Sequence, residues 1–119
     1  MSVRWQKTVS GEGMKTKVQI IYWRDIPVQV RVKNGRNRHT LPLSDRFQQT
    51  VYRAAYRAKA ITGDAYVEEW QPSEWEERVG ELVAVATAVA AELEAAFSDE
   101  RLHQLAQKKG YEENKIDGS

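Results

Sequence analysis

Side chains able to do acid–base or metal chemistry are few and widely spaced in this sequence. His39 and His103 stand far apart, and the chain has no cysteine. Carboxylates are concentrated between Glu68 and Glu77, where they would serve acid–base chemistry only if a pocket shifted their pKa values. The same run is typical of a helix start with a solvated acidic face. We therefore expect no catalytic residue, no metal site and no cofactor, and interpret both histidines as surface or structural residues.

Aromatic and charged residues are concentrated instead at the expected connections between elements. They occur at residues 22–25, at the start of the first expected helix, and over residues 64–70. Trp, Tyr and Arg are common anchors of protein interfaces because they combine a large contact area with a polar group. The alternative is that some of the tryptophans fill the core and that Asp25 caps its own turn. The residues that we expect to bind a protein partner are Trp23, Arg24, Asp25, Arg46, Tyr66, Glu69 and Trp70.

Charge is distributed unevenly along the chain, although the formal net charge is only +1. Residues 1–62 hold 13 lysines and arginines against three acidic residues, whereas residues 63–119 hold five against 14. Either the basic half binds nucleic acid, or the two halves face and neutralise each other in the fold. We favour the second explanation, because the nearby acidic half would repel phosphate. The residues of the nucleic-acid alternative are Arg31, Lys33, Arg36, Arg38, Arg53 and Arg57.

Length and composition indicate one globular domain. A chain of 119 residues with 41% hydrophobic and 29% charged residues is long enough to bury one core and too apolar to be disordered. The absence of cysteine fits a reducing compartment, and the uncharged stretch at residues 82–91 is too short to span a bilayer. We expect a cytoplasmic protein with a flexible leader at residues 1–14, a domain at residues 15–110 and a polar tail at residues 111–119.

Alternation of apolar and polar residues predicts strands over residues 17–23 and 28–33. The pair Asn34-Gly35 favours a tight hairpin, so a third strand should follow over residues 36–41 and give an antiparallel meander. Residues 64–70 have the aromatic and β-branched content of a fourth strand. The sequence therefore predicts an antiparallel sheet of three to four strands.

The first expected helix covers residues 44–61 and packs its apolar face on the sheet. On its other sides, Arg53 and Arg57 belong to one stripe, and Tyr52 and Tyr56 form another at a spacing of four residues. Either the arginines lie at the solvent boundary of a helix that is covered on two sides, or the arginines and tyrosines form a ligand-binding face.

A long acidic C-terminal helix is expected over residues 73–97. Ser73 as N-cap and Glu76 three residues later form a capping box, and the apolar residues that follow are spaced by four and three, as in a coiled coil. This seam permits a homodimer, although we favour packing on the chain's own sheet. A short terminal helix should begin after Ser98 and end at residues 108–110.

Three runs of the sequence carry a family resemblance: IIYWRDIPVQV at residues 20–30, LSDRFQ at residues 43–48 and DAYVEEW at residues 64–70. They resemble the small bacterial virulence factor domain family, which is related to a region of conserved virulence factor C. The resemblance covers roughly residues 17–105 and implies no catalytic residues. Stand-alone members often occur beside corrinoid- and folate-dependent methyl-transfer proteins, which implies an accessory role in one-carbon metabolism.

Together these patterns predict an α+β fold: an antiparallel three- to four-stranded sheet with one packed helix, a long acidic C-terminal helix and a short terminal helix. The predicted function is that of a non-catalytic protein-interaction or accessory module, a monomer or homodimer with a protein partner that the sequence does not identify. Two alternatives stay open, a nucleic-acid-binding domain that uses the basic half and an accessory subunit in corrinoid- and folate-dependent one-carbon metabolism.

Overall fold

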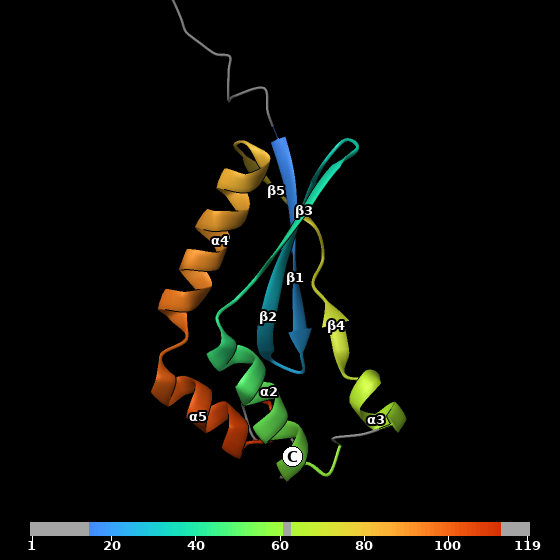
Figure 1. The fold of residues 1–119 in the computed structure, drawn as a ribbon, viewed down its shortest axis with the longest axis vertical. Helices are drawn as coiled ribbons and strands as arrows, with labels where there is room; N and C mark the ends of the chain where they lie inside the picture. Colours follow the sequence, from blue (N-terminus) through green and yellow to red (C-terminus); the bar gives the residue numbers. More distant parts are fainter. Residues whose placement is uncertain (1–14, 61–62, 113–119) are drawn as a thin grey trace, which may run out of the picture.

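The computed structural model describes residues 15–60 and 63–112 and confirms the α+β class. In chain order the elements are β1 (Lys15–Trp23), β2 (Ile26–Asn34), β3 (Asn37–Pro42), α2 (Asp45–Arg57), α3 (Gly63–Val67), β4 (Trp70–Pro72), β5 (Glu76–Val79), α4 (Leu82–Ala96) and α5 (Asp99–Gln107). In Figure 1, α4 lies along the sheet, whereas α2 and α5 lie together at the end where β1 turns into β2.

Both edges of β1 are hydrogen-bonded, which makes it the central strand of a five-stranded antiparallel sheet. One edge pairs with β2, from Lys17 opposite Lys33 to Trp23 opposite Ile26. The other edge pairs with β4 and β5, so the sheet is larger than the three to four strands expected. β3 completes the expected meander through a tight hairpin whose two loop residues are Gly35 and Arg36. Gly35 has a φ of 62° and Arg36 has no positive φ, which fits a type II′ turn with glycine at its first central position.

One residue of β2 has no direct partner on β1. The partners of Ile21 and Tyr22 on β2 are Gln29 and Pro27, so Val28 between them is extra. Such a bulge reverses the in–out alternation of the strand beyond it. The start of β2 therefore directs its side chains to a different part of the core from the rest of the strand.

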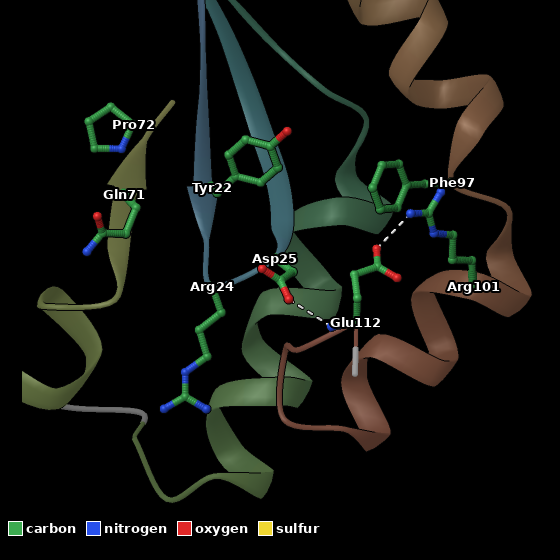
Figure 2. Close-up of a pocket in the computed structure, with 8 residues that line it drawn as sticks. All are labelled: Tyr22, Arg24, Asp25, Gln71, Pro72, Phe97, Arg101 and Glu112. Carbon is green, nitrogen blue, oxygen red and sulfur yellow. Dashed lines mark hydrogen bonds and ion pairs between the residues drawn. The ribbon is translucent and has the colours of Figure 1, made fainter. Parts of the chain in front are cut away.

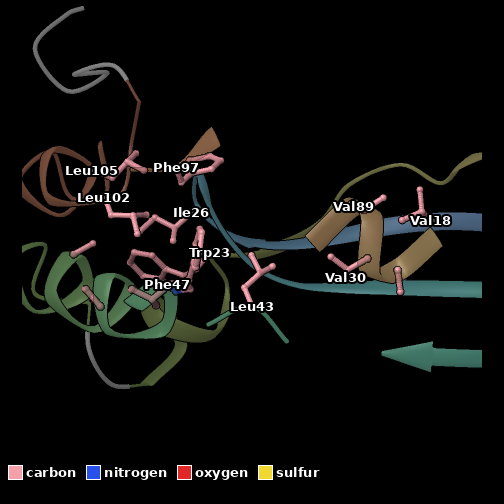
Figure 3. Packing of buried hydrophobic residues seen from close by; sticks show 14 of the residues in the cluster. Val18, Trp23, Ile26, Val30, Leu43, Phe47, Val89, Phe97, Leu102 and Leu105 are labelled. Carbon is pink, nitrogen blue, oxygen red and sulfur yellow. The ribbon is translucent and has the colours of Figure 1, made fainter. Parts of the chain in front are cut away.

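The buried side chains form two neighbouring groups within one core, which Figure 3 shows from close by. The group between the sheet and α4 consists of Val18, Val30, Val32, Val85, Ala86 and Val89. The group at the end of the sheet, beside α2 and α5, consists of Trp23, Ile26, Phe47, Val51, Leu102 and Leu105. Phe47 meets Phe97 edge-on, with ring centroids 5.9 Å apart, and so connects α2 with the end of α4.

The fourth strand expected over residues 64–70 is wrong for most of its length. The segment forms the short helix α3, and β4 begins only at Trp70. The rings of Tyr66 on α3 and Trp70 at the start of β4 lie 5.9 Å apart, and the Tyr66 ring also lies 5.9 Å from that of Trp23. Packing of these rings around the buried indole therefore prevails over the β-propensity of the segment.

The long helix expected over residues 73–97 is interrupted. Its first part forms β5, and α4 begins only after Glu81, whose carboxylate accepts the N–H of Ala84 at 3.0 Å. Ser73 caps no helix, because its hydroxyl accepts the N–H of Ile20 at 2.9 Å. Pairing of β5 with the second edge of β1 therefore prevails over the local capping box at Ser73. The coiled-coil-like seam is consequently limited to the residues of α4.

The first helix is about one turn shorter than expected, whereas the terminal helix is confirmed. Lys59 adopts a left-handed φ of 59° and the N–H of Ala60 donates to the carbonyl of Ala55 at 2.8 Å, which closes α2. Ser98 caps α5 by accepting the N–H of Arg101 at 3.1 Å. The expected leader lies outside the described residues, and of the expected tail only residues 111–112 are described.

Thr16 provides a test of the junction between β5 and α4. Its buried hydroxyl donates to the carbonyl of Gly80 at 2.7 Å. Thr16→Val keeps the shape of the side chain but leaves that carbonyl without this donor, so urea unfolding should show a loss of about 1–2 kcal/mol. The control is Thr40→Val on the exposed side of β3, which should change stability by less than about 0.5 kcal/mol. Equal effects would show that the Thr16 hydroxyl does not stabilise the junction.

Candidate functional site

The turn between β1 and β2 carries three of the residues expected to bind a partner, and the first of them lies in the core. The side chain of Trp23 has no exposed surface, and its indole N–H donates to the carbonyl of Tyr66 at 3.0 Å. A partner could reach this ring only if the fold opened. Trp23 is therefore a core residue, which corrects its expected role as a surface contact.

Arg24 connects this turn with the end of the described chain. Its guanidinium lies over the rings of Trp23 and Tyr111, at 4.9 and 4.7 Å from their centroids. Its Nη1 donates to the carbonyl of Lys109 at 2.8 Å, and its Nε lies 3.4 Å from the carboxylate of Glu69. The structure thus brings together Arg24 and Glu69, two of the expected binding residues, but only 12% of the Arg24 side chain is exposed.

Asp25 binds the same C-terminal segment through both its backbone and its carboxylate. Its N–H donates to the carbonyl of Gly110 at 2.8 Å, and its carboxylate accepts the N–H of Glu112 at 2.8 Å. Gly110 has a φ of 96°, and a Cβ there would lie 3.1 Å from the indole beneath it, so glycine suits this position. We call the docking of residues 109–112 on residues 23–25 the C-terminal clasp.

A pocket of about 550 Å³ lies beside the C-terminal clasp. Figure 2 shows the residues that line it, which are Tyr22, Arg24, Asp25, Gln71, Pro72, Phe97, Arg101 and Glu112. Its charged groups are mostly engaged with one another. Arg101 pairs with Glu112 at 2.7 Å, and Asp25 is held by the clasp.

The Tyr22 hydroxyl is the titratable group of this pocket with a shifted pKa. Burial raises its pKa, and the carboxylates of Asp25 and Glu76 raise it further. The phenol therefore stays protonated at neutral pH and can donate or accept a hydrogen bond. Among its lining residues the pocket offers hydrogen bonds to a ligand but no pair of groups arranged as nucleophile and base.

Arg46 lies apart from the clasp and holds three helices together. Its guanidinium donates to the carbonyls of Glu94 and Phe97 at 2.8 and 2.6 Å, which lie at the C-terminal end of α4. It also pairs with the carboxylates of Glu94 and Asp99, each at 3.1 Å. Arg46 therefore satisfies carbonyls that a helix end leaves free, and it does not join the other expected binding residues.

Tyr66 and Trp70, the last two expected binding residues, contact each other edge to face. Burial raises the pKa of Tyr66, and the nearby hydroxyl of Tyr52 raises it further, although hydrogen bonds from Gln48 and Trp70 oppose the shift. Tyr52 is 53% exposed and Tyr56 is 74% exposed. Tyr66 of α3 therefore lies near Tyr52, one of two exposed tyrosines on α2.

A second pocket, of about 580 Å³, lies between α2 and α5. Its lining residues are Tyr52, Arg53, Tyr56, Arg57, His103, Ala106 and Gln107, and we call it the tyrosine–arginine groove. Its walls are mainly carbon atoms. Within the described part of the chain, neither Arg53 nor Arg57 forms an ion pair. The sequence left open that the arginines and tyrosines of this helix form a ligand-binding face, and the structure places a cavity beside that face.

The α2 wall of the groove could be predicted, but the α5 wall could not. The spacing of Tyr52 and Tyr56 already indicated a common face. Nothing in the sequence indicated that His103 and Gln107, whose side-chain nitrogens lie 3.1 Å apart, would face that side of α2. The apolar residues of α5 predicted that one face of this helix is buried, but not that it packs against α2.

The six residues of the nucleic-acid alternative fall into two groups. Those on the β2–β3 hairpin are Arg31, Lys33, Arg36 and Arg38, and those on α2 are Arg53 and Arg57. The tip of the hairpin and α2 lie toward opposite ends of the molecule (Figure 1). The six therefore do not form one continuous basic surface.

Across residues 15–60 and 63–112, no cluster of three or more histidine or acidic side chains is arranged to hold a metal ion. Over the same residues, no helix combines the length and the apolar character that a membrane span requires.

A family model described as Virulence factor matches residues 21–106 of this chain. The chain belongs to the Virulence factor family. The match confirms the resemblance expected from the sequence. It begins within β1 and ends in α5, so the Virulence factor region includes the β1–β2 turn and most of the tyrosine–arginine groove, but not residues 109–112 of the C-terminal clasp.

One relative of this Virulence factor domain is the uncharacterized protein YpgR of Bacillus subtilis (strain 168), with 32% identity over 93 residues. The aligned part is 78% of this chain but 23% of YpgR, so the chain spans about a quarter of that relative's length. No solved structure matches the chain.

The C-terminal clasp can be tested at Gly110. Gly110→Ala places a methyl group against the Trp23 ring at a left-handed φ, so we expect urea unfolding, followed by tryptophan fluorescence, to show a loss of about 2–3 kcal/mol. Gly35→Ala is the matched control, because Gly35 also has a left-handed φ but open space around it. It should cost about 1 kcal/mol. Equal losses in the two variants would contradict close packing at the clasp.

Glu94 predicts a pH dependence of stability. Partial burial raises its pKa, but hydrogen bonds from the N–H and hydroxyl of Ser44 and from Arg46 outweigh this and hold it below the ordinary 4.5. Its carboxylate therefore stabilises the fold above that value, and this contribution is lost as pH falls through the folded pKa. Glu94→Gln should lower the free energy of unfolding at neutral pH, with a difference from the wild type that shrinks below about pH 4. If urea titrations give the same difference in free energy of unfolding at neutral pH and below about pH 4, the stabilisation does not come from the charge of Glu94.

Proposed function

We propose that this domain is a non-catalytic protein-interaction module that binds an acidic segment of a partner in the tyrosine–arginine groove. The observation that supports the proposal is a mainly apolar groove bordered by two exposed tyrosines and by two arginines that form no ion pair with any other described residue. Tyrosine and arginine are enriched among the residues that dominate binding energy at protein interfaces. The groove thus combines apolar surface, aromatic anchors and positive charge in one place.

The charges around the groove favour an acidic partner. Arg53 and Arg57 extend from α2, and Lys59 follows at its end. An acidic segment with one or two apolar side chains would complement both the arginines and the carbon-lined floor. The large exposed fraction of Tyr56 fits a contact that a partner covers, because exposed apolar surface next to a groove is typical of interaction sites.

Most of the residues first expected to bind a partner are engaged within the fold, which favours this groove as the binding surface. Trp23 is buried, Arg46 caps α4, and Arg24 and Asp25 hold the C-terminal clasp. Each of these four side chains already forms at least one hydrogen bond within the fold. Of the expected set, Tyr66 interacts with Tyr52 and is hydrogen-bonded to Trp70, and we include Tyr66 and Trp70 at the edge of the proposed surface.

The experiment is site-specific photo-crosslinking of the full chain in its native cells. A photoreactive phenylalanine analogue in place of Tyr56 should crosslink to a protein at an acidic segment, identified by mass spectrometry. The same analogue at Thr87, an exposed position on α4, is the matched control. A synthetic peptide of the crosslinked segment should then bind the purified chain, and Tyr52→Ala/Tyr56→Ala should weaken that binding at least about tenfold.

Three results would count against the proposal. The crosslinks from positions 56 and 87 could be the same, the peptide could bind the double variant as well as the wild type, or the contacted segment could be basic. Circular dichroism of each variant should match the wild type, because Tyr52 and Tyr56 are exposed.

A further inference from the structure

The sheet carries a second basic surface on the face opposite α4. Residues directly paired across antiparallel strands point to the same face, and Lys17, Lys33 and Arg38 are paired in this way across β1, β2 and β3. Arg31 and Lys15 lie two residues from members of this row along their own strands and share its face. We call these five residues the open sheet face. With strands about 4.8 Å apart and alternate residues about 6.7 Å apart, the five form a compact grid.

The open sheet face is accessible to solvent. The valines of the opposite face, such as Val18 and Val32, are buried in the core group under α4. The side chains of Lys15, Lys17, Arg31 and Arg38 are exposed, and Lys33 is half-buried. A macromolecule could therefore contact the grid without any movement of the helices.

The charge of this face is only partly neutralised by the acidic half of the chain. Among the described residues, the ion pairs use Arg24, Arg46, Arg78 and Arg101 and none of the five cations of the open sheet face. Glu77, opposite Lys17 on β5, is the acidic residue in register with the row. The face therefore keeps a local positive charge although the chain is nearly neutral.

An aromatic ring borders the cations. The Nζ of Lys33 lies 4.1 Å from the centroid of the Trp75 ring, so the half-buried indole lies on the same face. Proteins that bind single-stranded nucleic acids without sequence preference combine positive charge along the backbone with aromatic rings on which bases stack. A duplex read in its groove would instead require a protruding helix or ribbon, whereas this surface is the broad side of a sheet.

We infer that the open sheet face is a binding site for single-stranded nucleic acid, separate from the tyrosine–arginine groove. Phosphates bind to the grid of lysines and arginines, and a base packs against the border formed by Trp75. The site is independent of the proposed protein partner, because it uses other residues on another part of the fold.

The test measures fluorescence anisotropy of the full chain with a labelled 20-nucleotide oligo(U) and an oligo(dT) of the same length. Binding should weaken with salt, with a slope of log K against log salt of about −3 for four phosphate contacts. Arg31→Glu/Arg38→Glu should reduce affinity at least tenfold. Arg53→Glu/Arg57→Glu, which changes the net charge equally on α2, should reduce it less than threefold. Arg31→Lys/Arg38→Lys should keep most of the affinity, and Arg31→Gln/Arg38→Gln replaces the glutamate variant if that variant does not fold.

Other occupants of the face are outcomes of the same experiment. A 20-base-pair duplex, polyglutamate and vesicles containing phosphatidylserine are offered as competitors. The inference is overturned if no oligonucleotide binds at low salt, if the α2 variant loses as much affinity as the sheet variant, or if any of the three competitors binds more tightly than the single strands. Preferential, salt-dependent binding of the single strands, lost only in the sheet variant, supports it.

Discussion

The backbone of β1 is hydrogen-bonded on both edges, and the rest of the fold depends on this arrangement. β2 supplies one edge as the next element in the chain, but the other edge needs a segment that is distant in sequence. Unpaired buried backbone groups are costly, so the segment with β4 and β5 pairs there and Ser73 completes the ladder at Ile20. This pairing determines where α4 starts. The position of α4 then brings α5 beside α2 and the C-terminal residues back to the β1–β2 turn.

The sequence was sufficient where each element finds its partner close by. The Asn34-Gly35 hairpin, the alternating valines and the Ser98 cap depend on local signals, and all three are present. The segment that joins β1 from a distance was misassigned because its local preferences favour other structures. The same limit applies to the candidate site: spacing alone could place Tyr52 and Tyr56 on one face, but could not show that α5 forms the opposite wall.

Arginines illustrate why residue type alone is ambiguous. Arg46 looked like an interface anchor, yet its guanidinium caps a helix that follows much later in the chain. The two halves of the chain neutralise each other only in part. Arg24 and Arg46 pair with acidic residues of the second half, whereas Arg78 and Arg101 pair within that half. Some acidic residues of the second half therefore pair with arginines of that same half. The five cations of the open sheet face form no ion pair with another described residue.

The unpaired residue Val28 in β2 limits how this region can vary in length during evolution. Because the bulge sits between the part of β2 that faces α4 and the part that packs beside Trp23, a deletion there would exchange inward and outward side chains on one side of it. The hairpin tip at Gly35 has no such coupling, since no atom of the described residues would lie within 4 Å of a Cβ placed there. Insertions and deletions should therefore accumulate at the tip and be rare next to the bulge, so that the spacing from the turn to the valines is preserved even where the residues themselves change.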